Sequence, residues 1–182
     1  MKNKAINATT HVFSASDKLL PDANIWIYLN GPASDPTKWA VQTYSAILGD
    51  ILNAGAEVFL DVLVLSEFIN RFARMEMNRL QPGQRDFKAF RQSADFPPVA
   101  TAIQQQTSQI LAMCQPLDHP FSEWNHTQML TDFGLGCADW NDQLLVENCR
   151  KHGISPLTND GDFTEGGINV FTANGKLIRA CP

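Results

Sequence analysis

Short apolar runs alternate with stretches of helical periodicity along this chain. Residues 57–60 and 155–158 are short apolar runs of the kind that form buried strands. Residues 37–54 and 63–79 carry apolar side chains at helical spacing, and Gly55 provides a C-terminal stop for the first of these helices. The alternation predicts a three-layer α/β domain, with helices on both faces of a mainly parallel sheet of about five strands.

The remaining pattern predicts elements up to the end of the chain. These are a short basic helix at 86–92, a helix from about residue 98, a strand within 111–117, helices at 121–133 and 139–152, a strand at 168–172 and a turn at Asn174-Gly175. Gly153 is the expected stop of the helix at 139–152.

Segment 18–30, KLLPDANIWIYLN, allows two assignments. By β propensity, residues 25–29 form a strand. Alternatively, a short strand ends at Asp22 and a helix runs from about Asn24. The second assignment places Asp22 at a strand-to-helix junction, where the polar site residues of open α/β folds collect. The pattern alone leaves both assignments open.

The composition is that of a globular protein. The 182 residues are 44% hydrophobic and 18% charged, which suits one domain with a sizeable core. We therefore expect a polar lead-in at 1–17, followed by a single domain at 18–182 with a helical insertion around 80–98. The lead-in lacks the apolar segment of a signal peptide, and no apolar run is long enough to span a bilayer, so we expect a cytoplasmic protein without membrane contact.

Neither the cysteines nor the histidines show the spacing of a zinc site. The cysteines are Cys114, Cys137, Cys149 and Cys181, and the histidines are His11, His119, His126 and His152. There is no C-x-x-C and no H-E-x-x-H. We expect the cysteines to be buried thiols in a reducing compartment.

The net charge of −5 argues against binding nucleic acid by bulk charge. Six of the fourteen basic residues nevertheless fall in one segment, and they are candidates for facing RNA: Arg71, Arg74, Arg79, Arg85, Lys88 and Arg91. The structural alternative is an ordinary solvated helix surface.

Six carboxylates follow predicted strands or open predicted helices: Asp22, Glu67, Asp139, Asp142, Asp160 and Asp162. Such positions meet at one edge of a parallel sheet. Clustered carboxylates repel one another, and a divalent cation relieves that repulsion. An all-oxygen ligand set favours Mg²⁺ or Mn²⁺ over zinc.

Each acid also has a purely structural explanation. Asp139 is a good helix N-cap, and Asp142, in the first turn, suits the helix dipole. Asp160 precedes a glycine in a turn-like segment. Glu67 equally suits a first helical turn, and Asp22 suits a cap. The metal-site hypothesis therefore depends on the joint placement of the acids.

Three ordered segments resemble the PIN-domain family of metal-dependent nucleases. Asp22-Ala23-Asn24 followed by IWIYL is similar to the family's opening D-x-N, and VLVLSEFINRF resembles its second motif, with Glu67 in the acidic position. NDQLLVENCRKHGISPLTNDGDF is similar to the ending D-A-L-I-A-A…H-G…L-V-T-x-D-x-D-F. Asp142 occupies the position of the first aspartate in that ending.

The closing motif places four further residues: Thr158, Asp160, Asp162 and Phe163. The resemblance spans residues 18–173 and implies that the strand ends at Asp22. It also implies a Mg²⁺- or Mn²⁺-dependent endoribonuclease that hydrolyses RNA with metal-activated water.

The resemblance assigns roles to individual residues. It implies metal binding and catalysis by Asp22, Glu67, Asp142 and Asp160, with Asp162 as a fifth catalytic acid. Asn24, Thr158 and Asp139 would support the ligands. Many small prokaryotic relatives are toxins that pair with an antitoxin protein and form homodimers, so both partnerships are expectations here.

The sequence departs from the family pattern in the extra segment 79–98, in the N-terminal lead-in and at the bulky Trp140-Asn141. Two rival functions stay open. One is a catalytically silent PIN-like module that binds RNA or protein through segment 71–91. The other is a metal-dependent phosphatase, although an aspartyl-phosphate enzyme would want D-x-D where this chain has Asp22-Ala23-Asn24.

Overall fold

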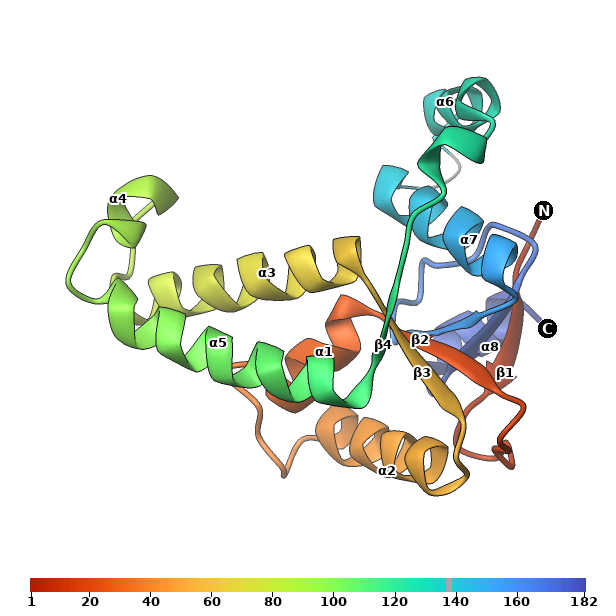
Figure 1. Ribbon diagram of the computed structural model, residues 1–182, viewed down its shortest axis with the longest axis horizontal. Coiled ribbons are helices and arrows are strands. Elements are labelled where there is room, and N and C mark those ends of the chain that lie inside the picture. The colour runs from red at the N-terminus through yellow and green to blue at the C-terminus, as the bar shows by residue number, and fades with distance from the viewer. Residues whose placement is uncertain (137–138) are drawn as a thin grey trace.

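A computed structural model describes residues 1–136 and 139–182 of the chain (Figure 1). The strands are β1 (Lys4–Asn7), β2 (Lys18–Pro21), β3 (Glu57–Asp61), β4 (Gln115–Leu117), β5 (Ser155–Leu157) and β6 (Asn169–Thr172). The helices are α1 (Ala23–Asn30), α2 (Trp39–Asn53), α3 (Val62–Leu80), α4 (Phe87–Arg91), α5 (Phe96–Met113), α6 (His126–Gly134), α7 (Trp140–His152) and α8 (Gly175–Ala180).

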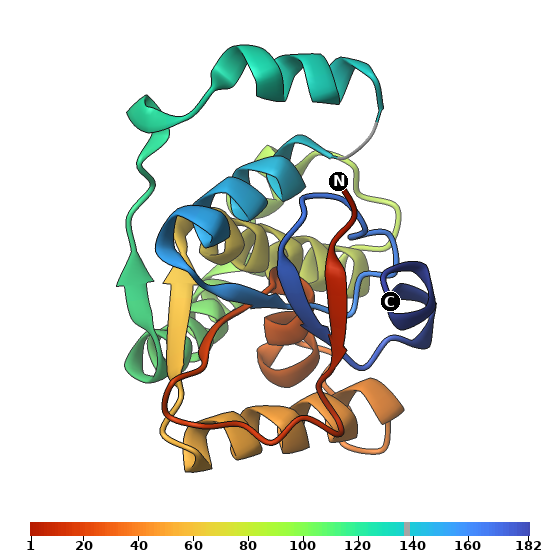
Figure 2. The same cartoon turned by 90° about the vertical axis from the view of Figure 1, so that its right-hand side faces the viewer.

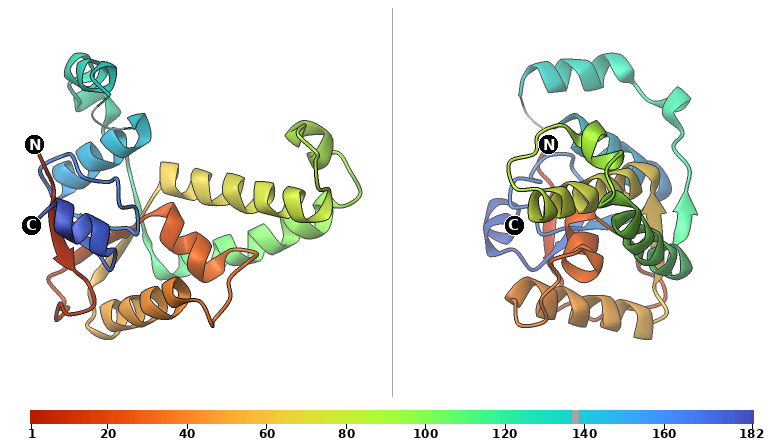
Figure 3. Two further views of the ribbon diagram at one scale, coloured as in Figure 1. Left: turned by 180° about the vertical axis from the view of Figure 1, so that it is seen from behind. Right: turned by 90° about the vertical axis from the view of Figure 1, so that its left-hand side faces the viewer.

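The six strands form one sheet in the order β1-β6-β5-β2-β3-β4, and every neighbouring pair is parallel. Helices α1, α3 and α5 lie on one side of the sheet, and α7 and α8 lie on the other (Figures 1 and 3). This arrangement confirms the predicted three-layer α/β fold. Since all strands are parallel, their carboxyl ends share one edge of the sheet.

The first seventeen residues are not a loose lead-in. Lys4–Asn7 form the edge strand β1, which pairs with β6 in the register Lys4–Asn169 to Asn7–Thr172 (Figure 2). The sheet therefore has six strands, whereas about five were predicted. The prediction failed because residues 4–7 gain their strand structure from pairing with a partner more than 160 residues away.

Most predicted elements are present, and segment 18–30 follows its second assignment. Strand β2 ends at Pro21, Asp22 is the N-cap, and IWIYL lies in α1. Segment 111–117 is only partly a strand, because α5 continues to Met113. Asn174-Gly175 is not an isolated turn: Asn174 caps α8 by accepting a hydrogen bond from the Lys176 amide.

Helices α3 and α5 extend away from the sheet as an antiparallel arm that carries α4 near its tip (Figure 1). Phe90 anchors α4, since it is fully buried and its ring lies 5.6 Å from that of Phe96. The predicted insertion around 80–98 corresponds to this end of the arm.

Helix α6 lies apart from the sheet, across α7 (Figures 1 and 2). A small cluster of Trp124, Met129 and Leu144 holds it there, separately from the main core. In the part of the chain that the structure describes, no helix combines the length and apolar character needed to cross a membrane.

Candidate functional site

Asp22 lies at the carboxyl end of the central strand β2. As the N-cap of α1, it accepts a hydrogen bond from the Ala23 amide at 2.6 Å through Oδ1. Oδ2 accepts from the Thr158 hydroxyl at 2.8 Å and from the Asn24 amide. Thr158 follows the neighbouring strand β5 and is fully buried. The side chain of Asp22 is therefore held in one orientation from two sides.

Asn24 and Thr158 support this carboxylate as expected. The Asn24 side chain also donates to the Thr158 hydroxyl at 2.9 Å and accepts from the Asn159 amide at 3.1 Å. The Asp160 amide donates to the same hydroxyl at 3.1 Å, so one threonine links the loops that carry Asp22 and Asp160.

Asn159 is a supporting residue that the sequence did not reveal. Its side chain accepts from the Tyr44 hydroxyl at 2.9 Å and donates to Tyr28 at 3.0 Å, while its carbonyl accepts from Asn174 at 2.7 Å. These bonds fix the loop immediately before Asp160. Its position next to Asp160 could have marked Asn159 as a candidate. Its tyrosine partners are more than 100 residues away in the sequence, so the hydrogen bonds themselves could not be predicted.

Four of the six predicted acids, Glu67, Asp139, Asp142 and Asp160, line a cavity of about 590 Å³ at the carboxyl edge of the sheet. Its lining combines α3, α7 and the loop after β5: Leu63, Ser66, Glu67, Asn70, Asp139, Asn141, Asp142 and Asp160. The structure thus brings together Glu67, Asp142 and Asp160 from three separate segments, as predicted from the joint placement of the acids. The cavity is the size of a small-ligand site.

Burial raises the pKa of Asp22 to about 6. The hydrogen bond from Thr158 and that from the Ala23 backbone act in the opposite direction, whereas the charges of Glu67 and Asp160 raise the pKa further. Asp22 therefore lies close enough to both acids to sense their charge, although it does not line the cavity itself.

Burial raises the pKa of Asp142 to about 7, and the charges of Asp22, Asp160, Asp139 and Glu67 add to the shift. Five carboxylates are thus coupled electrostatically around one place. Asp139 also caps α7, with Oδ1 accepting from the Asn141 amide at 2.8 Å. The cap explanation for Asp139 is correct, and the residue contributes negative charge as well.

Glu67 is half-exposed and forms an ion pair with Arg71 at 3.1 Å, one turn further along α3. It lies in the second turn of that helix, and the N-cap is Asp61. The guanidinium of Arg71 therefore lies next to the cavity and offsets part of its negative charge.

Asp162 lies outside the cavity. Its side chain is 83% exposed and pairs with Lys176 of α8 at 2.5 Å. Its amide donates to the Asp160 carboxylate at 2.8 Å, so Asp162 stabilises the turn through its backbone. Asp162 does not contribute to the raised pKa of Asp22 or of Asp142.

The donor set suits Mg²⁺ or Mn²⁺, since carboxylate and amide oxygens surround the cavity. The raised pKa of Asp142 marks a position where added positive charge would be favourable. Among residues 1–136 and 139–182, no group of three or more His, Cys, Asp or Glu side chains is arranged so that it could hold an ion as it stands.

Asp61 is a second buried carboxylate that the sequence did not single out. It is fully buried at the end of β3 and accepts from the Leu63 amide and from the Asn148 side chain, both at 2.7 Å. His119 Nε2 lies 2.5 Å from its Oδ2. Asp61 thereby connects α3, which carries Glu67, to α7.

The predicted basic residues lie along α3 and around α4. Arg71 is adjacent to the cavity, whereas Arg79 is engaged by Glu76 through two hydrogen bonds at 2.7 and 2.9 Å. Arg74 and Arg91 both lie against the ring of Phe87.

Three of the four cysteines are buried free thiols, as expected, and Cys137 lies outside the described residues. Burial raises the pKa of Cys114 to about 12. Burial also raises the pKa of Cys149, with the charges of Asp61 and Asp22 adding to the shift.

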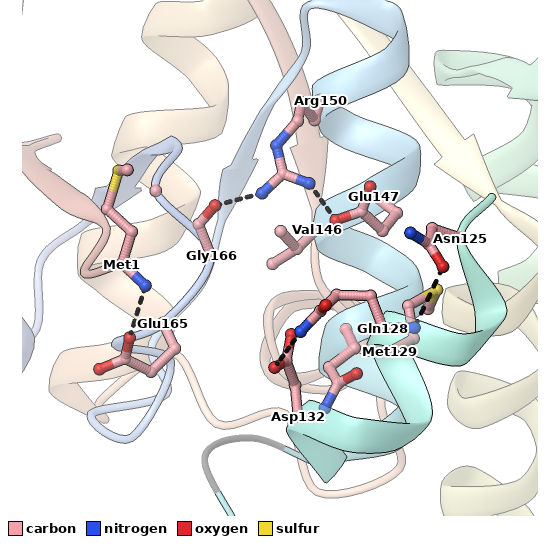
Figure 4. Close-up of a pocket in the computed structure, with 12 residues that line it drawn as sticks. Met1, Asn125, Gln128, Met129, Asp132, Val146, Glu147, Arg150, Glu165 and Gly166 are labelled. Carbon is pink, nitrogen blue, oxygen red and sulfur yellow. Dashed lines mark hydrogen bonds and ion pairs between the residues drawn. The ribbon is translucent and has the colours of Figure 1, made fainter.

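A second cavity, of about 600 Å³, lies between α6, α7 and the N-terminus (Figure 4). Most of its charged groups pair with one another, and Asp132 accepts a hydrogen bond from Gln128 instead. Arg150 donates to Glu147 and to the Gly166 carbonyl, and the amino group of Met1 lies 3.3 Å from Glu165. None of the predicted site acids lines this cavity.

No protein-family model matches the chain, and no curated protein matches it. A comparison with solved structures finds the crystal structure of PAE2754 from Pyrobaculum aerophilum, at a TM-score of 0.47 and 16% sequence identity. The likeness covers 96% of this chain and 95% of that chain. A TM-score at this level carries no inference about function.

Proposed function

We propose that this chain is a Mg²⁺- or Mn²⁺-dependent endoribonuclease. The observation that carries the proposal is geometric: Glu67, Asp142 and Asp160, from three different parts of the chain, line one cavity at the carboxyl edge of the sheet, and Asp22 lies beside them at the end of β2. The resemblance of the same four residues to the PIN-domain motifs supports it independently.

These four carboxylates would hold the ion. When bound, the ion would lower the pKa of a coordinated water and neutralise charge on the scissile phosphate. Thr158 and Asn24 keep the Asp22 carboxylate oriented toward that role. Burial and the four neighbouring carboxylates raise the pKa of Asp142 to about 7, and a cation bound there would offset that repulsion.

The proposed site needs no nucleophilic side chain. The role of Asp162 is reduced relative to the expectation from the resemblance, because its carboxylate is exposed and paired with Lys176. Its proposed contribution is to stabilise the Asp160 turn through its backbone amide. Pairing with an antitoxin and formation of a homodimer stay predictions that rest on the resemblance alone.

The test is cleavage of a panel of RNAs, with single-stranded DNA included, in Mg²⁺ or Mn²⁺ and again in EDTA. Asp142→Asn and Asp160→Asn should each abolish cleavage. Asp50→Asn, at an exposed position on α2, is the matched control and should cleave normally. Cleavage that persists in EDTA and in Asp142→Asn would exclude this mechanism.

Two further measurements separate the rival functions. Calorimetric titration with Mn²⁺ should give binding that Asp142→Asn weakens, whereas absence of binding would favour the catalytically silent module. Turnover of a generic phosphate monoester without RNA cleavage would favour the phosphatase.

A further inference from the structure

Helix α3 leads directly from the acidic cavity to the basic end of the arm. Glu67, Arg71 and Arg74 stand at positions i, i+4 and i+7, so they share one face of the helix. Arg74 lies about 10 Å along the axis from Glu67, since each residue adds about 1.5 Å. The positive side chains of Arg71 and Arg74 therefore lie along α3 in a row that begins at the rim of the cavity.

At the arm's tip, two arginines from different elements converge on one aromatic ring. The guanidinium carbon of Arg74, on α3, lies 4.8 Å from the centroid of Phe87, and that of Arg91, on α4, lies 5.3 Å from it. The two guanidinium groups are thus within about 10 Å of each other. The ring restricts both long side chains, which reduces the entropy that binding would cost.

Helix α4, which carries Phe87 and Arg91, is held firmly against the rest of the arm. Asp86 caps α4 by accepting from the amides of Lys88 and Ala89, and the buried Phe90 joins α4 to α5. Phe87 is partly buried beside Phe90, with ring centroids 6.3 Å apart. The two guanidinium groups are therefore presented on a fixed surface.

Arg74 and Arg91 also differ from Arg71 and Arg79 in charge pairing. Arg71 pairs with Glu67 and Arg79 pairs with Glu76, whereas the described residues supply no carboxylate within ion-pair distance of Arg74 or Arg91. Two nearby positive charges without a counter-charge repel each other, and a phosphate placed against them removes that repulsion.

We propose that Arg74 and Arg91, held against Phe87, bind backbone phosphates of a single-stranded RNA whose scissile bond lies at the acidic cavity. This inference rests on the proposed nuclease function and adds the binding surface. A chain with net charge −5 cannot hold RNA by bulk charge, so a local cluster next to the acids is required. We take the RNA to be a single strand, because side chains reach the bases and backbone of single-stranded RNA more readily than those of a duplex.

The experiment measures binding without cleavage. A fluorescently labelled single-stranded RNA is titrated with the full chain in EDTA, over a series of salt concentrations, and gels verify that the RNA stays intact. Each phosphate contact adds about 0.7 to the slope of log K against log salt for a single strand. Arg74→Ala/Arg91→Ala should therefore reduce the steepness of this slope by about 1.4. If both proteins bind equally when extrapolated to about 1 M salt, the variant binds roughly 25-fold more weakly than the wild type at about 0.1 M.

The matched control is Lys38→Ala/Arg179→Ala, which removes two exposed charges outside the arm, one at the N-cap of α2 and one on α8. It should leave the slope nearly unchanged. Arg74→Lys/Arg91→Lys keeps the charges and should retain most of the slope, which distinguishes lost phosphate contacts from a disturbed arm.

An unchanged slope in Arg74→Ala/Arg91→Ala, an equal fall in the control pair, or tighter binding to double-stranded RNA would each overturn the proposal. The outcome is independent of catalysis. If the wild type cleaves RNA while the slopes of all variants agree, this binding surface fails and the nuclease function stands. If the slopes differ as expected but no metal supports cleavage, the nuclease function fails and the binding surface stands.

Discussion

Replacing Asp142 by asparagine should stabilise the metal-free protein while abolishing its activity. Asp142 lies among four other carboxylates, and burial together with their charges raises its pKa to about 7. Ionising Asp142 among these carboxylates destabilises the folded state and so lowers the free energy of unfolding. Asparagine resembles the protonated acid in shape and cannot ionise, so it removes that cost.

The pH dependence follows from the direction of the shift. Below 3.8, the ordinary pKa of an aspartate, the carboxyl is protonated in both the folded and the unfolded state, so its contribution to stability is fully present. As pH rises from 3.8 toward 7 the unfolded chain ionises first, and the free energy of unfolding falls. The loss is complete above pH 7. The gain from Asp142→Asn should therefore be small at pH 4 and maximal near pH 8.

The size of the gain has an upper bound. A shift of about three pKa units corresponds to about 4 kcal/mol. Asp142 is partly exposed and its repulsion is screened by solvent, so we expect about 1–2 kcal/mol. For a chain of this length each kcal/mol raises Tm by about 2–4 °C, which gives an increase of roughly 2–8 °C.

The assay is thermal unfolding in EDTA at pH 4, 6 and 8 for the wild type, Asp142→Asn and the control Asp50→Asn. Excess Mg²⁺ or Mn²⁺ should raise the Tm of the wild type and have less effect on Asp142→Asn, because the cation relieves the same repulsion. A Tm for Asp142→Asn that is equal to or below that of the wild type at pH 8 would refute the reasoning. An equal gain at pH 4 would do so as well.

Three other predictions concern the residues that support the site and the burial of the cysteine thiols. His119→Ala should lower the free energy of unfolding in urea by about 0.5–1.5 kcal/mol, because the ring loses its packing against Trp124, 5.4 Å away between centroids, and its contact with Asp61. An unchanged free energy of unfolding would contradict these contacts. Thr158→Val should reduce cleavage and Mn²⁺ affinity by roughly 10–100-fold, since Asp22 loses an orienting hydroxyl; Thr158→Ser should restore most of both. In a Cys137→Ser background the folded protein at pH 8 should react with a thiol reagent far more slowly than the urea-unfolded protein, because the other three thiols are buried; a rapid reaction of the folded protein would contradict that burial.

Signals carried by neighbouring residues predicted the order of the elements. Alternating short apolar runs and helical periodicities gave the three-layer α/β fold, and Gly153, with φ 65°, ends α7 as expected from its position. Asp139 caps that helix through a bond to a residue two positions away. Such features depend on a few consecutive residues, so they can be predicted from the sequence alone.

Features that depend on distant partners could not be read in this way. β1 is a strand because β6 lies beside it, and Asp61 becomes a buried junction because Asn148 and His119 meet it from other elements. The motif match makes Asp160 a metal ligand and Asp162 a fifth catalytic acid, yet tertiary packing places only Asp160 at the cavity and turns Asp162 toward Lys176 on α8.

The sequence by itself thus placed Asp22, Asp139 and Asp160 next to strand ends or helix starts, because those positions follow from local periodicity and capping. It did not single out Asp61, which ends β3 and caps α3. Only the tertiary structure decided which of these acids share one electrostatic environment. Raised pKa values arise from burial and from charges brought close by folding, and neither quantity exists in the extended chain.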